Sequence, residues 1–262
     1  MKKLRAFIIL LIMSAASACT SLPEGDVEII AHRGVPYAAP ENTLASARLA
    51  WERGADAVEI DVHQTRDGQI VVIHDSSTIR VAAVNKFIRH TDYDELKKID
   101  VGSHFSSRFS GERIPLLAEV LEILPPGKNI YAEIKSDSTL LPEMARVIRK
   151  SGREENVRII SFRKQVLQQA KQLIPGVPCY LLLLHVPQKG RSALMKELEH
   201  LGLDGVDLFH AAVTPGLVSE LSNNGFACIT WTVNSFAAAR RLIEAGVTGI
   251  TTNMAGCFKK RK

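Results

Sequence analysis

Two histidine motifs and a pair of carboxylates could do chemistry together in this chain. His32-Arg33-Gly34 ends one short apolar run, and His74-Asp75 ends another. Glu59 and Asp61 lie between them in an x-Glu-x-Asp pattern. Two imidazoles can serve as general acid and base, two carboxylates can hold a hard cation, and an arginine can clamp a phosphate. These are the groups that metal-assisted hydrolysis of a phosphodiester requires.

The elements that position these residues follow from the hydrophobic pattern. After residue 26 the chain alternates short apolar runs with amphipathic segments. The runs expected to form strands are 27–31, 57–62, 129–134, 157–161, 179–184, 205–208, 227–233 and 249–252. The expected helices are 43–53, 116–124, 140–150, 164–173, 191–201, 216–223 and 236–245. This alternation predicts an α/β fold, a parallel (β/α)8 or TIM barrel.

One further apolar run, 70–73, does not fit the alternation. It follows the run 57–62 after a connection too short for a parallel crossover, and Asp67-Gly68 in that connection favours a hairpin. Such a hairpin places Glu59 roughly opposite His74-Asp75. We therefore predict a small insertion of about residues 63–113 after the second strand, forming a cap over the barrel mouth. The alternative is that 70–73 is itself a barrel strand.

The carboxyl ends of the strands are where a barrel of this kind collects its reactive residues. Glu59 and Asp61 are two apart on one strand and therefore point to the same face, as do Glu133 and Lys135 on the next. Glu59, Asp61 and Glu133 form an all-oxygen ligand set that suits Mg²⁺ or Ca²⁺.

Each of these residues also has a structural interpretation. His32 alone could be a buried histidine with satisfied hydrogen bonds, and Glu59 alone could pair with Arg33 or Lys135. Ionisable residues at three successive strand ends are nevertheless improbable as accidents, because an uncompensated buried charge is costly. The six other histidines are expected to be surface or loop residues.

The ordered motifs make the sequence similar to the glycerophosphodiester phosphodiesterase family, which is related to bacterial phosphatidylinositol-specific phospholipase C. The resemblance runs from Ile29 to about Met254. It rests on Ala31-His32-Arg33-Gly34, Pro40-Glu41-Asn42-Thr43, Glu59-Ile60-Asp61-Val62, Thr65-x-Asp67-Gly68, Val72-Ile73-His74-Asp75, Ile114-Pro115-x-Leu117, Glu133-Ile134-Lys135, Ser161-Phe162, Trp231-Thr232-Val233-Asn234 and Ile250-Thr251-Thr252-Asn253.

This resemblance implies a barrel with an insertion after its second strand. It implies that His32 and His74 act as acid and base, and that Glu59, Asp61 and Glu133 hold the divalent cation. The sequence departs from the family after His74-Asp75. A Leu-x-Arg-Thr-Thr-like stretch is usual there, whereas this chain reads Ser-Ser-Thr-Ile-Arg-Val-Ala-Ala over residues 76–83.

For substrate binding, we expect Arg33 and Lys135 to contact the phosphate. Trp231 is expected either to form an apolar wall for the glycerol carbons or to pack in the barrel. The reaction expected is hydrolysis of a glycerophosphodiester to an alcohol and glycerol 3-phosphate. The alternatives are a lysophospholipase-D-like activity on lysophospholipids and a catalytically silent, surface-anchored protein that binds phosphodiesters.

The first 18 residues have the pattern of an export signal: basic residues, an apolar run too short to span a bilayer, then small residues. Ala16-Ser17-Ala18-Cys19 resembles the lipobox of bacterial lipoproteins, in which the cysteine is lipidated. We therefore expect residues 19–26 to be a tether and Cys19 to anchor the protein in the cell envelope, at the outer membrane or in the periplasm. Simple cleavage after Ala18 and a periplasmic or secreted protein is the alternative.

Charge and cysteine content bear on the expected partners and on disulfide bonding. The formal net charge is +5, but three positive charges lie in the expected export signal and four in a basic tail at 259–262, so we expect no nucleic-acid partner. Cys179 and Cys228 lie in apolar runs and are expected to be buried thiols and not a disulfide pair.

Overall fold

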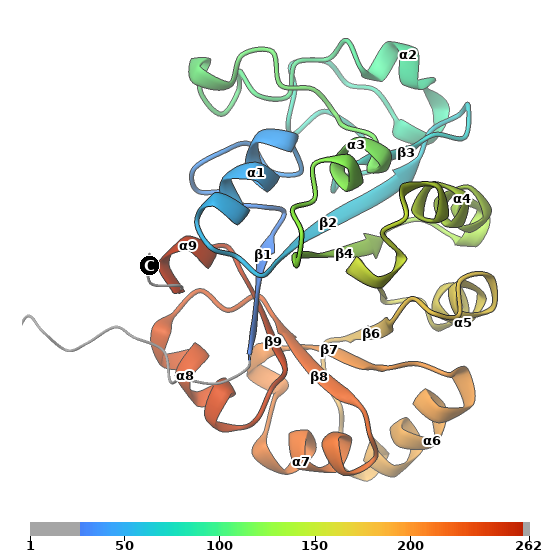
Figure 1. Ribbon diagram of the computed structural model, residues 1–262, viewed down its shortest axis with the longest axis vertical. Coiled ribbons are helices and arrows are strands. Elements are labelled where there is room, and N and C mark those ends of the chain that lie inside the picture. The colour runs from blue at the N-terminus through green and yellow to red at the C-terminus, as the bar shows by residue number, and fades with distance from the viewer. Residues whose placement is uncertain (1–26, 259–262) are drawn as a thin grey trace, which may run out of the picture.

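The computed structural model describes residues 27–258, and these form a barrel of parallel strands surrounded by helices (Figure 1). The barrel strands are β1 (Glu28–His32), β2 (Ala57–Gln64), β4 (Asn129–Ile134), β5 (Val157–Ser161), β6 (Cys179–Leu183), β7 (Gly205–Phe209), β8 (Ala227–Trp231) and β9 (Gly249–Thr252). The helices around it are α1 (Leu44–Glu52), α3 (Leu117–Glu122), α4 (Leu141–Ser151), α5 (Lys164–Leu173), α6 (Arg191–Leu201), α7 (Pro215–Asn223), α8 (Phe236–Glu244) and α9 (Ala255–Phe258).

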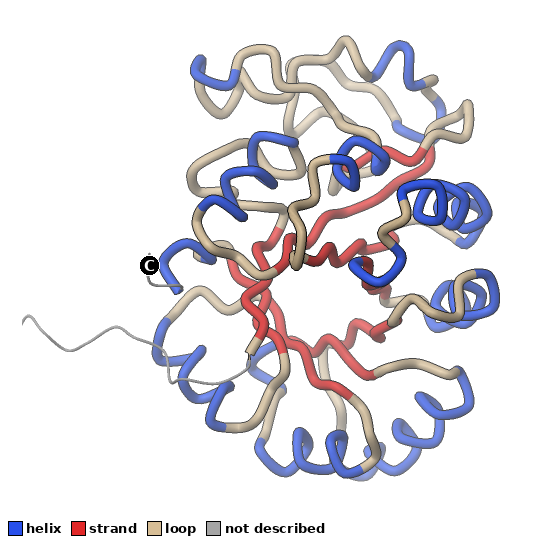
Figure 2. Tube along the Cα trace, viewed as in Figure 1, coloured by secondary structure: helices blue, strands red, loops and turns tan. Residues whose placement is uncertain are grey.

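The pairing of the strands closes the sheet on itself. β1 pairs in parallel with both β2 and β9, and every other barrel strand pairs in parallel with its neighbours. Figure 2 shows the resulting ring of strands with the helices outside it. Within residues 27–258 this is a closed barrel of eight parallel strands, so the predicted TIM barrel is confirmed.

Alternate residues of each strand point to the two sides of the barrel wall. The helix-facing set forms the main hydrophobic core between strands and helices. The inward set forms a smaller cluster that fills the barrel: Ile30, Ala57, Tyr131, Ile160, Tyr180, Leu182 and Ile229. Because these side chains fill the barrel interior, a ligand would bind at the carboxyl ends of the strands, where barrels of this kind carry their reactive residues.

Local signals in the sequence set the helix limits. The hydroxyls of Thr43, Thr214 and Ser235 accept backbone N–H bonds at the starts of α1, α7 and α8. α4 and α6 end at Gly152 and Gly202, both in the left-handed conformation. The predicted bounds of α5 and α6 agree with the structure, and the other predicted helices differ by a few residues at their ends.

The insertion after β2 begins with the predicted hairpin. β3 (Ile70–Val72) pairs antiparallel with the end of β2, with Val62 opposite Val72. The alternative, in which this run is a barrel strand, is wrong, because β2 continues the barrel through its parallel pairing with β4. The only α-helix of the insertion, within the part of the chain that the structure describes, is the short α2 (Tyr93–Leu96).

The insertion has a hydrophobic core of its own, formed by Val71, Ile73, Val81, Ala82, Ile88, Leu96, Val101 and Ile114. We expected the insertion to form a cap over the barrel mouth. In the view of Figure 2 the insertion lies to one side of the ring of strands, beyond β2 and β3. A separate core lets the insertion pack as its own unit against the barrel wall, and its edge at His74 borders the mouth.

Cys179 and Cys228 are buried free thiols, as expected, and burial raises the pKa of each to about 12. No helix among residues 27–258 is long and apolar enough to cross a bilayer. The predicted export signal, the lipidation site at Cys19, the tether and the basic tail lie outside the described residues.

Candidate active site

The turn after β1 is built so that Arg33 meets the second strand. Arg33 has a φ of 53° and Gly34 a φ of 84°. A Cβ on Gly34 would lie 2.2 Å from the Ser46 Oγ, so only glycine fits there. The turn directs the Arg33 backbone N–H to Glu59 Oε2, at 2.9 Å. The glycine of the His32-Arg33-Gly34 motif is therefore required by the backbone path beside α1.

Asn42 fixes the orientation of Asp61. Its side-chain amide donates to Asp61 Oδ2 at 2.8 Å, and its side-chain oxygen accepts from the Asp61 backbone N–H at 3.1 Å. Asn42 has a φ of 56°, a left-handed conformation that asparagine tolerates better than most residues. Arg33 Nε also lies 3.2 Å from Asp61 Oδ2. One oxygen of Asp61 is thus held by cationic and amide groups.

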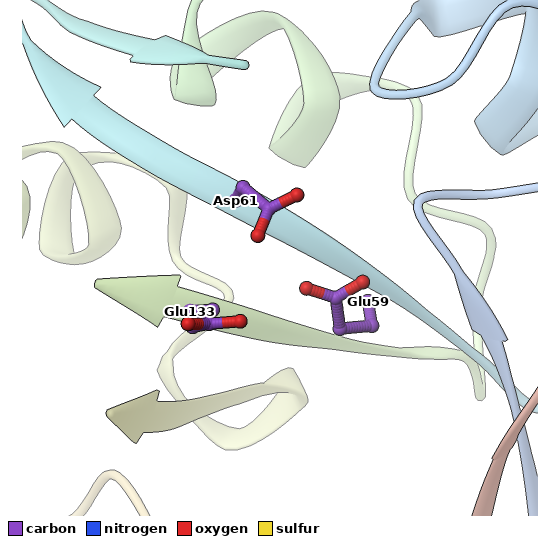
Figure 3. A group of neighbouring side chains, drawn as sticks. All are labelled: Glu59, Asp61 and Glu133. Carbon is purple, nitrogen blue, oxygen red and sulfur yellow. The ribbon is translucent and has the colours of Figure 1, made fainter. Parts of the chain in front are cut away.

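Three carboxylates converge between β2 and β4. Figure 3 shows Glu59 and Asp61 on β2 and Glu133 on β4 with their carboxyl groups gathered together. One oxygen from each lies within 4.8 Å of the other two. Glu59 Oε1 and Asp61 Oδ1 are buried and have no hydrogen-bond partner. Orphaned carboxylate oxygens arranged in this way fit a hard divalent cation, which prefers oxygen ligands.

The electrostatics of the cluster also favour a bound positive charge. Burial, Asp61 and Glu133 raise the pKa of Glu59 well above its usual range, and burial and Asp61 raise the pKa of Glu133. Burial alone would raise the pKa of Asp61 too, but Arg33 and Lys135 keep it low. Three ionised carboxylates at this spacing repel one another, and a bound cation would relieve that repulsion.

Lys135 connects the acidic cluster to the second histidine. Its Nζ lies 2.8 Å from Glu133 Oε1, 3.5 Å from Asp61 Oδ1 and 3.2 Å from His74 Nε2. On the other side of the ring, His74 Nδ1 lies 2.6 Å from Asp75 Oδ1. These contacts fix the imidazole at both nitrogens and place His74 at the edge of the acidic cluster.

Arg80 lies in the stretch that departs from the family pattern, and it supports His74 indirectly. Its guanidinium donates to Asp75 Oδ2 at 2.6 Å and to both carboxylate oxygens of Glu41. Glu41 also lies 3.2 Å from Arg33 Nη1. Arg80 therefore joins the loop after His74 to the loop after β1.

His32, at the end of β1, is held by a residue that follows the neighbouring strand β9. Its Nδ1 lies 2.7 Å from Asn253 Oδ1, and its Nε2 lies 3.9 Å from Glu59 Oε2. An N–H at Nδ1 donates to the Asn253 oxygen and leaves Nε2 as the acceptor facing the carboxylates. Burial, followed by the nearby Arg33 charge, lowers the pKa of His32, so the ring is neutral at pH 7.

The cavity that contains these groups has a volume of about 360 Å³ and two unlike walls. The charged wall is formed by His32, Arg33, Glu59, His74, Glu133 and Lys135. The opposite wall is formed mainly by Ile160, Phe162, Leu182, Trp231 and Asp207. The Trp231 ring lies edge-on to Phe162 and Phe209, and its Nε1–H donates to the Asp207 carbonyl oxygen at 3.1 Å. Trp231 is thus both packed against the barrel and exposed to the cavity.

The structure brings together all the predicted catalytic, metal-binding and substrate-binding residues: His32, His74, Glu59, Asp61, Glu133, Arg33, Lys135 and Trp231. Sequence reasoning did not assign four neighbours, Asn42, Asp75, Asn253 and Asp207. The first three lie in the motifs on which the family resemblance rests, and those motifs could have indicated that these residues belong to the site. Asp207 is a charged residue within the otherwise apolar stretch 205–209, and that interruption could have marked it as a candidate site residue. The guanidinium of Arg33, which is expected to contact the phosphate, pairs here with Glu41 and Asp61.

Fold and cavity together define the class: a TIM-barrel enzyme that hydrolyses phosphoric diesters. The chain belongs to the glycerophosphoryl diester phosphodiesterase family, which its sequence matches over residues 32–256. It is 36% identical to a glycerophosphodiester phosphodiesterase of Caldanaerobacter subterraneus over 231 residues, 86% of this chain and 93% of the relative. It is 29% identical to a glycerophosphodiester phosphodiesterase of Bacillus subtilis over 95% of this chain and 91% of the relative.

Solved structures agree with this assignment. A phosphodiesterase of Oleispira antarctica, determined in complex with the product sn-glycerol-3-phosphate, superimposes with a TM-score of 0.79 at 28% identity. That match covers 90% of this chain and 95% of the other. A glycerophosphodiester phosphodiesterase of Agrobacterium tumefaciens gives a TM-score of 0.78 at 25% identity, over 88% of this chain and 98% of the other.

Proposed function

We propose that the protein hydrolyses glycerophosphodiesters to an alcohol and glycerol 3-phosphate, using a divalent cation and two histidines. The observation that carries this proposal is the convergence of Glu59, Asp61 and Glu133 on a cavity that also contains both histidines. The bound sn-glycerol-3-phosphate of the Oleispira antarctica relative supports a small phosphorylated polyol as the product.

The three clustered carboxylates would hold the cation, and their all-oxygen donor set favours Mg²⁺ or Ca²⁺. When bound, the cation supplies positive charge that stabilises the phosphate as negative charge develops in the transition state. Lys135 and Arg33 line the same cavity and add positive charge for the substrate phosphate. Arg33 also compensates Asp61, which it contacts directly.

The contacts of the two histidines suggest different roles. His32 is neutral at pH 7 and its Nε2 faces the carboxylate cluster, so it can accept a proton from the attacking hydroxyl. The attacking group is water, or the neighbouring glycerol hydroxyl, which would expel the alcohol and form a cyclic phosphate that water must then open to give glycerol 3-phosphate. His74 is held by the Asp75 carboxylate, which can balance a positive charge on the ring. We therefore propose His32 as the base and His74 as the acid that protonates the leaving alcohol. In that role the Nε2–H of His74 turns to the leaving oxygen and replaces the contact that Nε2 makes with Lys135 Nζ.

The test is the turnover of glycerophosphocholine by His32→Ala and His74→Ala variants. Loss of a positioned acid or base lowers kcat by about 10²- to 10⁴-fold. The control is His200→Ala, because His200 is exposed on α6 and distant in sequence from the motifs. Wild-type activity in either variant would overturn the acid–base assignment.

A second substrate class is favoured by the apolar wall of the cavity. Phe162 lines that wall and is 47% exposed, and Leu184, just beyond the carboxyl end of β6, is 64% exposed. These residues could contact the single acyl chain of a lysophospholipid. Comparing turnover of glycerophosphocholine with lysophosphatidylcholine separates the two activities. Tight binding of both without turnover, with cation present, would instead indicate a silent binding protein.

We also propose, from the sequence alone, that the protein is exported and lipid-anchored to the cell envelope through Cys19. An anchor there would hold the cavity close to membrane-derived substrates. Metabolic labelling with a fatty acid tests this: label retained by the wild type and absent from Cys19→Ala is the expected result.

A further inference from the structure

One buried carboxyl in the cavity has no part in the mechanism described above. Asp207 lies on β7, is only 1% exposed, and its Oδ1 has no hydrogen-bond partner. Its neighbours in register are apolar, Leu182 on β6 and Ile229 on β8. A buried polar atom without a partner costs free energy, so its presence needs an explanation.

Asp207 is separate from the candidate metal site. Within residues 27–258, the carboxylates close enough together to share an ion are Glu59, Asp61 and Glu133. Asp207 lines the same cavity from the opposite, mainly apolar wall, beside Trp231 and Leu182. A ligand held between the two walls would therefore present its phosphate to the charged wall and another part to Asp207.

The chemistry of this carboxyl suits a hydroxyl group. Burial, and to a lesser extent Glu133, raises the pKa of Asp207 well above its usual range, which favours the protonated form. A protonated carboxyl offers one donor and one acceptor, which a hydroxyl can satisfy together.

The depth of the cavity indicates which part of the substrate reaches this position. All glycerophosphodiesters share the glycerol phosphate unit, whereas their head groups vary and need access to solvent. The buried end of the cavity therefore suits the constant part, and its exposed rim, which includes Phe162, suits the variable part. On the basis of the proposed function, we infer that Asp207 hydrogen-bonds a free hydroxyl of the glycerol unit and selects for substrates that carry it.

The test compares two phosphodiesters. Glycerophosphocholine carries the free glycerol hydroxyls, and bis(4-nitrophenyl) phosphate carries none. Removing a partner of a buried hydrogen bond should lower kcat/KM by about 10- to 100-fold. We expect Asp207→Leu to show this loss on glycerophosphocholine, mainly through KM, with little change on bis(4-nitrophenyl) phosphate. Asp207→Asn keeps a donor and an acceptor and should retain most of the activity.

A binding measurement gives a readout independent of turnover. Calorimetric titration with sn-glycerol 3-phosphate should show weaker binding to Asp207→Leu than to wild type, whereas inorganic phosphate should bind both equally. Thermal unfolding should show Asp207→Leu to be at least as stable as wild type, because the variant removes an unpaired polar group from an apolar wall. Ile229→Val, a packing change beside Asp207, should leave the ratio of the two activities unchanged.

The outcomes separate this inference from the proposed function. Wild-type turnover of both diesters with equal losses in Asp207→Leu would overturn the inference alone. Unchanged binding of sn-glycerol 3-phosphate by that variant would also overturn it. A wild type that turns over neither diester with Mg²⁺ or Ca²⁺ present would overturn the proposed function, and the inference with it.

Discussion

At the scale of single residues, the contacts of His74 show how the site orients an imidazole at the edge of the acidic cluster. Asp75 accepts from one ring nitrogen, and Lys135 Nζ lies beside the other. Partial burial acts to raise the pKa of Asp75, but hydrogen bonds from Arg80 and His74 outweigh burial and hold it below its usual value. The carboxylate therefore stays ionised at neutral pH and keeps the imidazole in one orientation.

The first prediction concerns this orientation. Asp75→Asn preserves the shape of the side chain, but its amide can donate a hydrogen bond to Nδ1 and favour the wrong tautomer of His74. We expect kcat for glycerophosphocholine to fall by roughly 10²-fold or more, with a smaller effect on KM. The control is Asp94→Asn, because the Asp94 side chain is 81% exposed and pairs with Lys97 in the insertion. Equal kcat values for Asp75→Asn and wild type would exclude a positioning role for Asp75.

Site residues could be predicted from the sequence where two of them lie on one strand at a spacing of two. Glu59 and Asp61, like Glu133 and Lys135, are two apart on a strand, so a shared face follows from the sequence spacing. Asn42 could not be placed in this way, because its contact with Asp61 depends on a left-handed loop residue. Asp207 could not be predicted as a site residue from its spacing, because a single acidic residue in an apolar strand has no second residue whose spacing would indicate a shared site.

At the scale of elements, the insertion matters because it carries His74, Asp75 and Arg80. Its turns are held by polar side chains as well as by its hydrophobic core. The Asp100 carboxylate accepts backbone N–H bonds from Gly102, Ser103 and Gly111, and these bonds lower its pKa. Because Asp100 links both ends of the segment 102–111, it stabilises this part of the insertion.

The second prediction is a pH-dependent effect of Asp100. Since the pKa is lower in the folded state, the stabilisation is fully present above the unfolded value of about 3.9 and is lost as the pH falls through the folded pKa. Asp100→Ala should lower the thermal unfolding midpoint by a few degrees at pH 7. The difference from wild type should shrink below about pH 4. A difference that stays constant down to about pH 3 would show that ionisation of Asp100 has no part in it.

The fold was predictable at this scale because each strand and helix carries a local signal. The Asp67-Gly68 hairpin identified β3 correctly, and capping residues limited the helices. The position of the insertion beside the mouth was not predictable. That position depends on a second hydrophobic core, which includes Val81, Ile88 and Val101. These residues follow neither a helix nor a strand period in the sequence, so the hydrophobic pattern does not predict that they pack together.

At the scale of the whole molecule, the barrel places three mutually repelling carboxylates in one buried cluster, where Glu59 is 2% exposed. The fold therefore carries an electrostatic cost that a cation would relieve, which links cation binding to stability.

The third prediction follows from that linkage. A cation at 100 times its Kd stabilises the folded state by about 2.7 kcal/mol, which raises the midpoint by about 5–10 °C in a domain of this size. Differential scanning fluorimetry with EDTA, Mg²⁺ and Ca²⁺ measures the shift. We expect Glu133→Gln to remove most of it. Identical midpoints for wild type with EDTA and with both cations would argue against a site at this cluster.

The most direct test of the central claim is turnover of glycerophosphocholine after exhaustive chelation and metal restoration. If Glu59, Asp61 and Glu133 hold the cation that the reaction needs, chelated protein should be inactive and Mg²⁺ or Ca²⁺ should restore release of glycerol 3-phosphate. Glu133→Gln, folded as judged by circular dichroism, should need a higher cation concentration for the same rate. Full activity in the chelated wild type would contradict the account.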